Sequence, residues 1–268
     1  MSREVKVLSM SESEIKRHWD EVAKKFIPVD TAYSTSVMNE GEFWLFGRYY
    51  PVLKDKKVLK LDLWNEAYML PILSKAYGVG MQIYGIDISK EVVEKAHDRF
   101  EALNIPHHFV IADMRVLPFE DNFFDYIWTM GTLEHVPDPE KSIRDMYRIL
   151  KPGGRAIIGI PYKYDPFGCA FAVWLGNKLD ILPYGEELVF TWPQMKKLVQ
   201  AAPFKIVGRS GAYFFPWFIR FADMFFNQRL PVLSIPLWPL IWLFGKLDKI
   251  NFLRKYNRIL AIIVEKPQ

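Results

Sequence analysis

The chain has 268 residues, of which 50% are apolar and 25% are charged, so it can bury a sizeable core as one large α/β domain or as a domain with an appendage. Its net charge of +4 is mild and gives no support to nucleic-acid binding. Cys169 is the only cysteine, which excludes an intrachain disulfide and a metal cluster built from cysteines.

The first residues suggest the compartment. Arg3, Glu4 and Lys6 are charged, and the segment lacks an apolar stretch of signal-peptide length. A single cysteine also fits a reducing environment. We therefore expect a cytoplasmic protein.

Residues 11–26 are predicted to form a helix, because the apolar residues from Ile15 to Phe26 recur on one helical face. Residues 27–50 have a mixed, aromatic-rich pattern that predicts no single element. We treat residues 1–54 as an N-terminal helical cap over the rest of the chain. Three of its aromatic residues are candidate walls for a bound acceptor: Trp19, Tyr33 and Phe43.

Apolar segments and helical patterns alternate in the rest of the chain. Strands are expected at 57–61, 82–86, 108–111, 124–129 and 155–160, with two further strands at 204–207 and 259–264. Helices are expected at about 66–77, 90–103, 139–150 and 191–202. Parallel strands need crossover connections, and continuous apolar runs indicate strands that are covered on both faces. The pattern predicts a doubly wound, seven-stranded, mostly parallel sheet, with its core in residues 55–211 and 258–268.

Two acidic residues follow neighbouring strands of this predicted sheet, where ligands bind in such folds. Asp87 ends the second strand, and its two oxygens suit the paired hydroxyls of a ribose or, alternatively, the N-terminus of the next helix. Asp113 ends the third strand and precedes Met114, a soft side chain that suits a flat base; alternatively, Asp113 is a solvated loop residue. These residues predict one nucleoside pocket.

The stretch from Ile111 to Gly154 is the most specific part of the sequence. Its parts are the acid Asp113, the turn Leu117-Pro118-Phe119, the strand at 124–128, the segment Leu133-Glu134-His135-Val136 and a helix that ends in Lys151-Pro152-Gly153-Gly154. This succession resembles the second half of a class I S-adenosylmethionine (SAM) methyltransferase domain of the ubiquinone-methyltransferase-like branch. The resemblance is strong over about residues 55–165 and weaker over 190–210 and 258–266. It implies SAM as cofactor and methyl transfer to a small-molecule or lipid-like acceptor.

The resemblance also implies roles for single residues. Asp87 would hold the ribose, and Asp113 would accept a hydrogen bond from the adenine amino group. Ile88 and Met114 would pack against the two sides of the base, and Thr129 would line the methyl-transfer side. His135 is a candidate general base, or it orients its loop through a backbone hydrogen bond. No metal-ligand spacing stands out among the five histidines.

The family's glycine-rich loop after the first strand is missing. There is no glycine between Gly47 and Gly78, and Trp64 stands where glycines are expected. One register places Lys60 at the position of the family's acid, and another places Asp62 there. In a polar substitute for the loop, Asp62 and Glu66 would bind the ammonium of SAM and Lys60 its carboxylate. The alternative is a helix start, with Asp62 as its cap and Glu66 in its first turn.

This departure keeps other functions open. The chain could be a catalytically silent relative that serves as a binding or scaffold module at membranes. It could also use an adenosyl donor that lacks the methionine carboxylate. The presence of Asp87 and Asp113 favours an enzyme.

Residues 212–257 form a predicted insertion between the last two strands. From Ala212 to Phe244 there are seven phenylalanines and three tryptophans but only three charged residues. The uncharged run Leu230–Gly245 is 16 residues long and contains three prolines, so it is too short to span a bilayer. We expect short helices that contact a membrane surface or cover the acceptor, with a basic segment behind them that suits anionic headgroups. A homodimer interface and an ordinary core are the alternatives.

Overall fold

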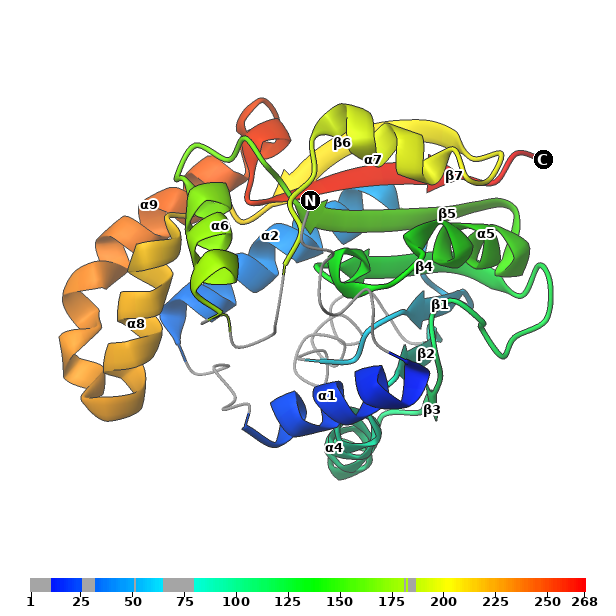
Figure 1. Cartoon of the computed structure of the whole chain (residues 1–268), viewed down its shortest axis with the longest axis horizontal. Helices are drawn as coiled ribbons and strands as arrows, with labels where there is room; N and C mark the ends of the chain where they lie inside the picture. Colours follow the sequence, from blue (N-terminus) through cyan, green and yellow to red (C-terminus); the bar gives the residue numbers. More distant parts are fainter. Residues whose placement is uncertain (1–10, 26–31, 51, 65–79, 181, 183–186) are drawn as a thin grey trace.

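The computed structural model describes residues 11–25, 32–50, 52–64, 80–180, 182 and 187–268. Its centre is a seven-stranded sheet in the order β3-β2-β1-β4-β5-β7-β6 (Figure 1). The strands are β1 (Lys57–Lys60), β2 (Gln82–Asp87), β3 (His107–Ile111), β4 (Phe124–Met130), β5 (Leu150–Pro161), β6 (Lys205–Ala212) and β7 (Ile259–Glu265). β7 runs antiparallel between β5 and β6, and the other pairings are parallel. The predicted doubly wound, mostly parallel sheet is confirmed.

Helices cover both faces of the sheet. They are α1 (Glu12–Lys25), α2 (Tyr33–Tyr49), α4 (Lys90–Ala102), α5 (Pro139–Ile149), α6 (Cys169–Leu179), α7 (Trp192–Val199), α8 (Trp217–Arg229) and α9 (Trp238–Asp248). Short 3-10 turns lie at η2 (Leu133–His135), η3 (Pro231–Leu233), η4 (Ile235–Leu237) and η5 (Leu253–Tyr256). The helix expected at 66–77 lies outside the described residues.

The core has two layers because side chains alternate along each strand. On β4, Ile127 belongs to a cluster that also contains Ile143 of α5 and Leu198 of α7. The next residue, Trp128, belongs to a second cluster with Phe46 of α2. Thus α5 and α7 cover one face of the sheet, and α2 and α4 cover the other.

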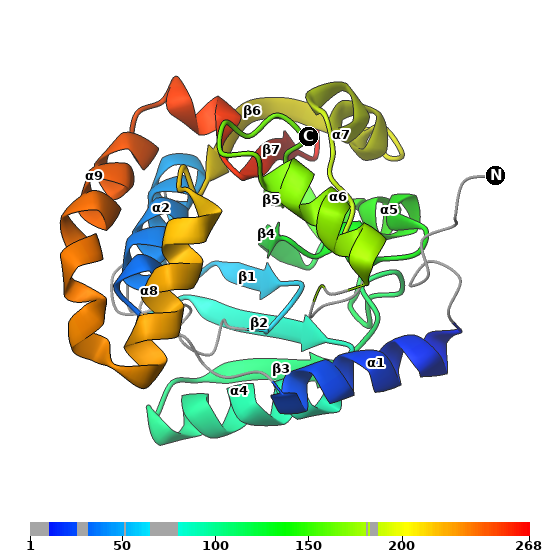
Figure 2. The same ribbon diagram turned by 60° about the vertical axis from the view of Figure 1, so that its left-hand side comes forward.

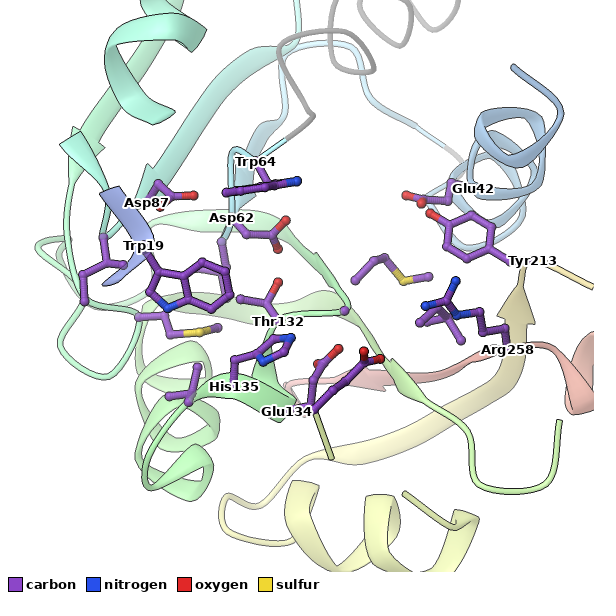
Figure 3. A pocket seen from close by; sticks show the side chains of 18 of the residues that line it. Trp19, Glu42, Asp62, Trp64, Asp87, Thr132, Glu134, His135, Tyr213 and Arg258 are labelled. Atoms are coloured by element: carbon purple, nitrogen blue, oxygen red, sulfur yellow. The ribbon is translucent and has the colours of Figure 1, made fainter. Parts of the chain in front are cut away.

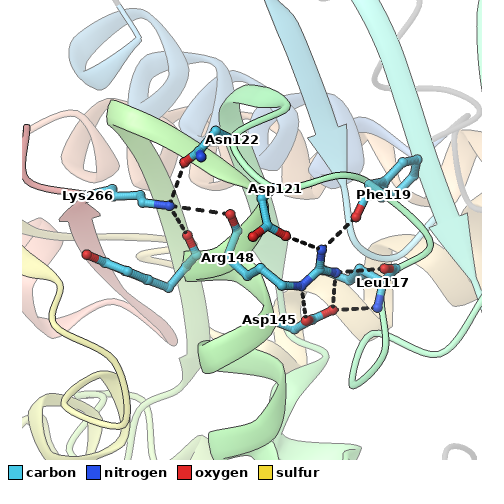
Figure 4. A network of polar contacts seen from close by, with 8 residues as sticks. Leu117, Phe119, Asp121, Asn122, Asp145, Arg148 and Lys266 are labelled. Carbon is cyan, nitrogen blue, oxygen red and sulfur yellow. Dashed lines mark hydrogen bonds and ion pairs between the residues drawn. The ribbon is translucent and has the colours of Figure 1, made fainter.

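The loop from β3 to β4 is held by Arg148 near the end of α5 (Figure 4). Its guanidinium forms an ion pair with Asp145 at 2.7 Å and donates to the carbonyls of Phe119 and Leu117 at 2.7 and 2.9 Å. Asp121 adds a second carboxylate at 2.9 Å. The Leu117-Pro118-Phe119 turn is therefore a structural connection, which fixes the path of the chain after Asp113.

The segment 27–50, which sequence patterns left undecided, contains α2, and α2 carries the insertion. Figure 2 shows α9 on the side of α2 that faces away from the sheet, and α2 contacts both α8 and α9. The crossing of α2 and α9 is close, because a Cβ atom added at Gly245 would lie 2.4 Å from a methyl of Val37. Helix α2 is therefore buried on more than one side, and its sequence shows no clean amphipathic stripe.

Candidate functional site

A cavity of about 370 Å³ lies at the carboxyl edge of the sheet, between the strand ends and helices α1, α2 and α8 (Figure 3). Its size is in the range of small-molecule sites. Asp87 and Asp113 both line it, with Ile88, Met114, Asp62 and His135. Strand β2, which ends in Asp87, pairs with β3, which ends two residues before Asp113. The sequence prediction that these side chains share one pocket agrees with this geometry.

Asp87 connects the second strand to the loop after β1. One carboxylate oxygen accepts from the backbone N–H of Ser89 at 2.9 Å, and the other accepts from that of Leu63 at 3.1 Å. Burial raises the pKa of Asp87 to about 7; the two backbone hydrogen bonds oppose this rise. Each oxygen retains a lone pair for a further donor.

Asp113 has a different electrostatic environment. Arg115 donates to both of its oxygens, at 2.5 to 3.0 Å, and the Arg115 backbone N–H adds a bond at 2.8 Å. Burial alone would raise the pKa of Asp113, but the hydrogen bonds and charge of Arg115 outweigh it and hold the pKa below its ordinary value. Asp113 is therefore a fixed anion beside Met114, which is buried.

The loop after β1 contains a buried ion pair instead of glycines. The Lys60 ammonium, in a side chain that is 1% exposed, lies 2.5 Å from one oxygen of Asp62. The hydroxyl of Thr129 donates to the other oxygen at 3.0 Å. Asp62 lines the cavity, whereas Lys60 and Thr129 are not among the lining residues. Lys60 and Thr129 thus contact Asp62 on the side away from the cavity. The geometry does not support the predicted direct contacts of Lys60 and Thr129 with the cofactor.

Trp64 occupies the cavity wall at the place where the family has glycine. None of Leu61 to Trp64 is among the residues with positive φ in the described chain. This part of the loop therefore takes a conformation that needs no glycine. Glu66, the other predicted ammonium ligand, lies outside the described residues.

Comparisons with known proteins agree with this arrangement. A family model described as "Methyltransferase domain" matches residues 65–158. Tocopherol O-methyltransferase of Arabidopsis thaliana is 38% identical over 117 residues, which cover 43% of this chain and 29% of that protein. Residues 65–158 thus have the sequence of a methyltransferase domain.

Solved structures similar to this methyltransferase domain show the same fold. Geranyl diphosphate C-methyltransferase from Streptomyces coelicolor has a TM-score of 0.61 at 12% identity, with 95% of this chain and 97% of that chain covered. The [4+2]-cyclase SpnF has a TM-score of 0.61 at 17% identity, with 94% and 92% covered. The sequence matches, in contrast, span only 26% to 34% of the length of three curated relatives.

Helix α1 closes the cavity of the methyltransferase domain beside Asp87. Trp19 lies edge-on to Trp64, with ring centroids 6.1 Å apart, and edge-on to His135 at 5.3 Å. The helix is held in place by Asp20, which accepts from the Ser89 hydroxyl at 2.6 Å. Among the three predicted acceptor walls, Trp19 lines the cavity.

The other two predicted walls lie elsewhere. Tyr33 packs on Trp238 of α9, with centroids 5.2 Å apart, and Phe43 packs against the core cluster that contains Phe46. Neither lines the cavity. The helical period of α2 explains this, because the face that lines the cavity is a different one. That face consists of Thr35, Met38, Asn39 and Glu42.

Carboxyl groups gather at the far end of the cavity, away from Asp87 (Figure 3). Burial raises the pKa of Glu134 well above its ordinary value; nearby Glu187 adds to the rise and Arg258 opposes it. The pKa of Glu187 is also raised by burial, against the effect of Arg258. One oxygen of Glu134 is buried without a hydrogen-bond partner among the described residues. Sequence reasoning gave no role to these residues, since a glutamate's burial has no local sequence signal.

Helix α8 of the insertion completes this end of the cavity with Arg220, Phe221 and Met224. Tyr213, which also lines the cavity, has a φ of 73°, a conformation rare for a bulky residue. Within the described residues, no group of three or more histidine, cysteine or acidic side chains is arranged to hold a metal ion.

Proposed function

We propose that this protein transfers a methyl group from SAM to a lipid-like small molecule. One observation carries the proposal: a single cavity joins the two nucleoside-side aspartates to a wall of the apolar insertion. The relatives support the acceptor class, since one is a tocopherol methyltransferase and one structural neighbour is a geranyl diphosphate methyltransferase.

The cavity's residues fit the adenosyl part of SAM. Asp87 retains lone pairs for the ribose hydroxyls, and Asp113 offers an anion to the adenine amino group beside the apolar surface of Met114. Asp62, braced by Lys60 and Thr129, is the proposed partner of the cofactor's ammonium. When bound, SAM supplies an electrophilic methyl group on a positively charged sulfur. The protein's contribution is to orient the two molecules and to exclude water.

At the acceptor end, Glu134 and Glu187 are proposed to bind a polar atom of the substrate, and Phe221 and Met224 to contact its apolar body. Because their pKa values are raised, the glutamates hold protons more readily than free carboxyls. His135 packs against Trp19, so we propose that it positions the α1 wall, with general-base catalysis as the alternative role.

Membrane association is part of the proposal. Phe221 lines the cavity and yet is 58% exposed, so the acceptor end opens next to an apolar surface. A lipid-like acceptor is concentrated in membranes, and a peripheral site would meet it there. Among the described residues, no helix is both long and apolar enough to cross a bilayer.

Calorimetric titration with SAM and S-adenosylhomocysteine tests the cofactor site. We expect both to bind, and Asp87→Ala to weaken S-adenosylhomocysteine binding by about 1.5–3 kcal/mol, or roughly 10- to 150-fold, because a bond to a charged group is lost. Asp98→Ala, at an exposed position on α4, is the matched control. Binding of neither ligand at millimolar concentration would favour a silent binding module. Tighter binding of decarboxylated SAM would favour the alternative donor.

Cofactor affinity is also expected to depend on pH. The pKa of Asp87 is raised to about 7, so the carboxylate loses its charge as the pH falls below neutrality. If ribose binding needs the ionised form, the S-adenosylhomocysteine dissociation constant rises about tenfold from pH 8 to pH 6. Asp113, with its lowered pKa, stays ionised throughout this range. A flat profile, or one that persists in Asp87→Asn, would show that another group titrates.

A further inference from the structure

We infer that α6, α8 and α9, with the turns η3 and η4, form one docking face for an anionic lipid bilayer, and that the acceptor enters the cavity from this bilayer past Phe221. The entry route rests on the proposed function. The docking itself does not, and it is measured without any enzymatic assay.

The apolar surface of the chain is concentrated on the insertion. Of the 25 large apolar side chains that the described residues expose, 14 belong to residues 212–257. On α8, the exposed residues Phe218, Phe221 and Phe225 follow a helical spacing and form one stripe. On α9, Trp238 and Trp242 are one turn apart and exposed. Contiguous apolar surface on this scale marks an interaction site.

The charges that residues 212–257 themselves expose have one sign. The only acids in residues 212–257 are Asp223 and Asp248, and both are buried. Asp223 accepts from the Ser34 backbone N–H at 2.8 Å, and Asp248 forms an ion pair with Arg254 at 3.3 Å. The exposed charges of this segment are therefore basic.

Two of these basic side chains lie over exposed rings of the insertion. The Arg229 guanidinium is 3.9 Å from the centroid of the Phe225 ring, and the Lys246 ammonium is 5.4 Å from that of Trp242. A cation beside an aromatic ring suits the headgroup level of a bilayer, where the ring is half immersed and the cation meets lipid phosphate. A second copy of the chain would instead bring two basic rims together across a twofold axis.

Helix α6 extends the same pattern. The stacked side chains of Phe171 and Trp174 are exposed, and the Lys178 ammonium lies 5.4 Å from the Trp174 ring. The segment before α6 is joined to the insertion by Phe167, whose ring is 5.0 Å from Phe214 and 5.5 Å from Phe244. Two segments distant in sequence thus repeat the same arrangement of exposed rings and cations.

The face continues into the cavity at α8. Phe221 is the residue that belongs to both, and its neighbours Arg220 and Met224 line the cavity. A molecule that leaves the bilayer at this helix would reach the end of the cavity that contains Glu134 and Glu187 without crossing bulk water.

Flotation with vesicles tests the inference. The full-length protein is mixed with vesicles of phosphatidylcholine alone, or of phosphatidylcholine with about one third phosphatidylglycerol. We expect stronger binding to the anionic vesicles. Phe218→Ser with Phe225→Ser should lower binding to both kinds of vesicle at least about tenfold, because buried apolar area is lost. Arg229→Glu with Lys246→Glu should lower binding to the anionic vesicles alone.

Matched controls use exposed residues outside the face: Val116→Ser for the apolar change and Lys197→Glu for the charge change. None of the substituted side chains lines the cavity, so titration with S-adenosylhomocysteine should be unchanged in every variant and reports correct folding. Equal flotation of the face variants and their controls would overturn the inference. So would a wild-type dimer in solution that the phenylalanine variants dissociate while vesicle binding is absent. Vesicle binding without any nucleoside binding would instead retain the docking face and remove the proposed function.

Discussion

Replacing Arg254 by alanine is expected to lower the free energy of unfolding by about 3–5 kcal/mol, the range for breaking a buried ion pair by removing one partner. Arg254 lies in η5, at the end of the insertion, and its side chain is fully buried. The substitution leaves Asp248 buried without its cation. We expect the insertion to detach from α2 before the sheet unfolds.

The expected loss is large because Arg254 joins three parts of the chain. Its guanidinium donates to the Asp248 carbonyl at 2.7 Å, to the Gly41 carbonyl of α2 at 2.8 Å and to the Ser210 hydroxyl of β6 at 3.1 Å. It also lies over the Trp44 ring at 4.2 Å. The approach needs glycine at position 41, since a Cβ there would clash with the Asp248 carboxylate.

The destabilisation by Arg254→Ala should increase with pH. Burial raises the pKa of Asp248, and the charge of Arg254 opposes this rise. Without Arg254, the folded state keeps the proton to a higher pH, and stability is lost as the pH rises through that higher pKa. Urea unfolding at pH 5 and pH 8 measures the difference, with the exposed neighbour Lys255→Ala as control. A loss that is small, or equal at both pH values, would contradict the role assigned to the pair.

The part of the site that follows from strand ends could be predicted from sequence. An acid at the end of a strand, or just after it, must lie at the carboxyl edge of a parallel sheet, and Asp87 and Asp113 do so on paired strands. Their electrostatic environments could not be predicted. The guanidinium of Arg115 forms an ion pair with the Asp113 carboxylate, whereas the backbone amide of Leu63, which is distant in sequence, donates to the Asp87 carboxylate.

The residues at the proposed acceptor end of the cavity could not be predicted from sequence for a related reason. Glu42, Glu187 and Arg258 come from three segments that only the folded chain brings together. Their sequence neighbourhoods resemble those of ordinary surface charges, because burial depends on packing between distant elements. The same holds for α2, whose several buried faces mask the helical period. Trp19 lines the cavity from a helix with a single apolar face, and its contact with an acceptor stays a prediction.

The loop after β1 is where the sequence departs most from the family pattern, and in the structure it contains a specific polar arrangement. The sequence allows two registers, one with Lys60 and one with Asp62 in place of the family's acid. Both residues belong to one arrangement, in which the ammonium of Lys60 holds the carboxylate that faces the cavity. The chain thus presents an acid to the cavity without a glycine loop.

Asp62→Ala is accordingly expected to lower the free energy of unfolding by about 3 kcal/mol, because it leaves the Lys60 ammonium buried without its carboxylate. The ammonium would keep its interaction with the Trp128 ring, whose centroid is 4.9 Å away, but would lose the carboxylate oxygen that lies 2.5 Å from it. Lys60→Met should cost less, since the Asp62 carboxylate faces the cavity and keeps the Thr129 hydroxyl.

A double-mutant cycle separates the pair from its parts. Adding Lys60→Met to Asp62→Ala removes the buried positive charge that has lost its carboxylate, so the double variant should regain most of the stability that Asp62→Ala loses. Urea unfolding at pH 7 measures all four proteins, and S-adenosylhomocysteine titration follows on those that fold. The affinity of the double variant for SAM gives a further test. This variant should be stable but lacks the Asp62 carboxylate that is proposed to bind the ammonium of SAM, so we expect it to bind SAM more weakly than the wild type does. Additive losses of stability would mean that Lys60 and Asp62 act independently, and undiminished SAM affinity would place the methionine half of the cofactor elsewhere.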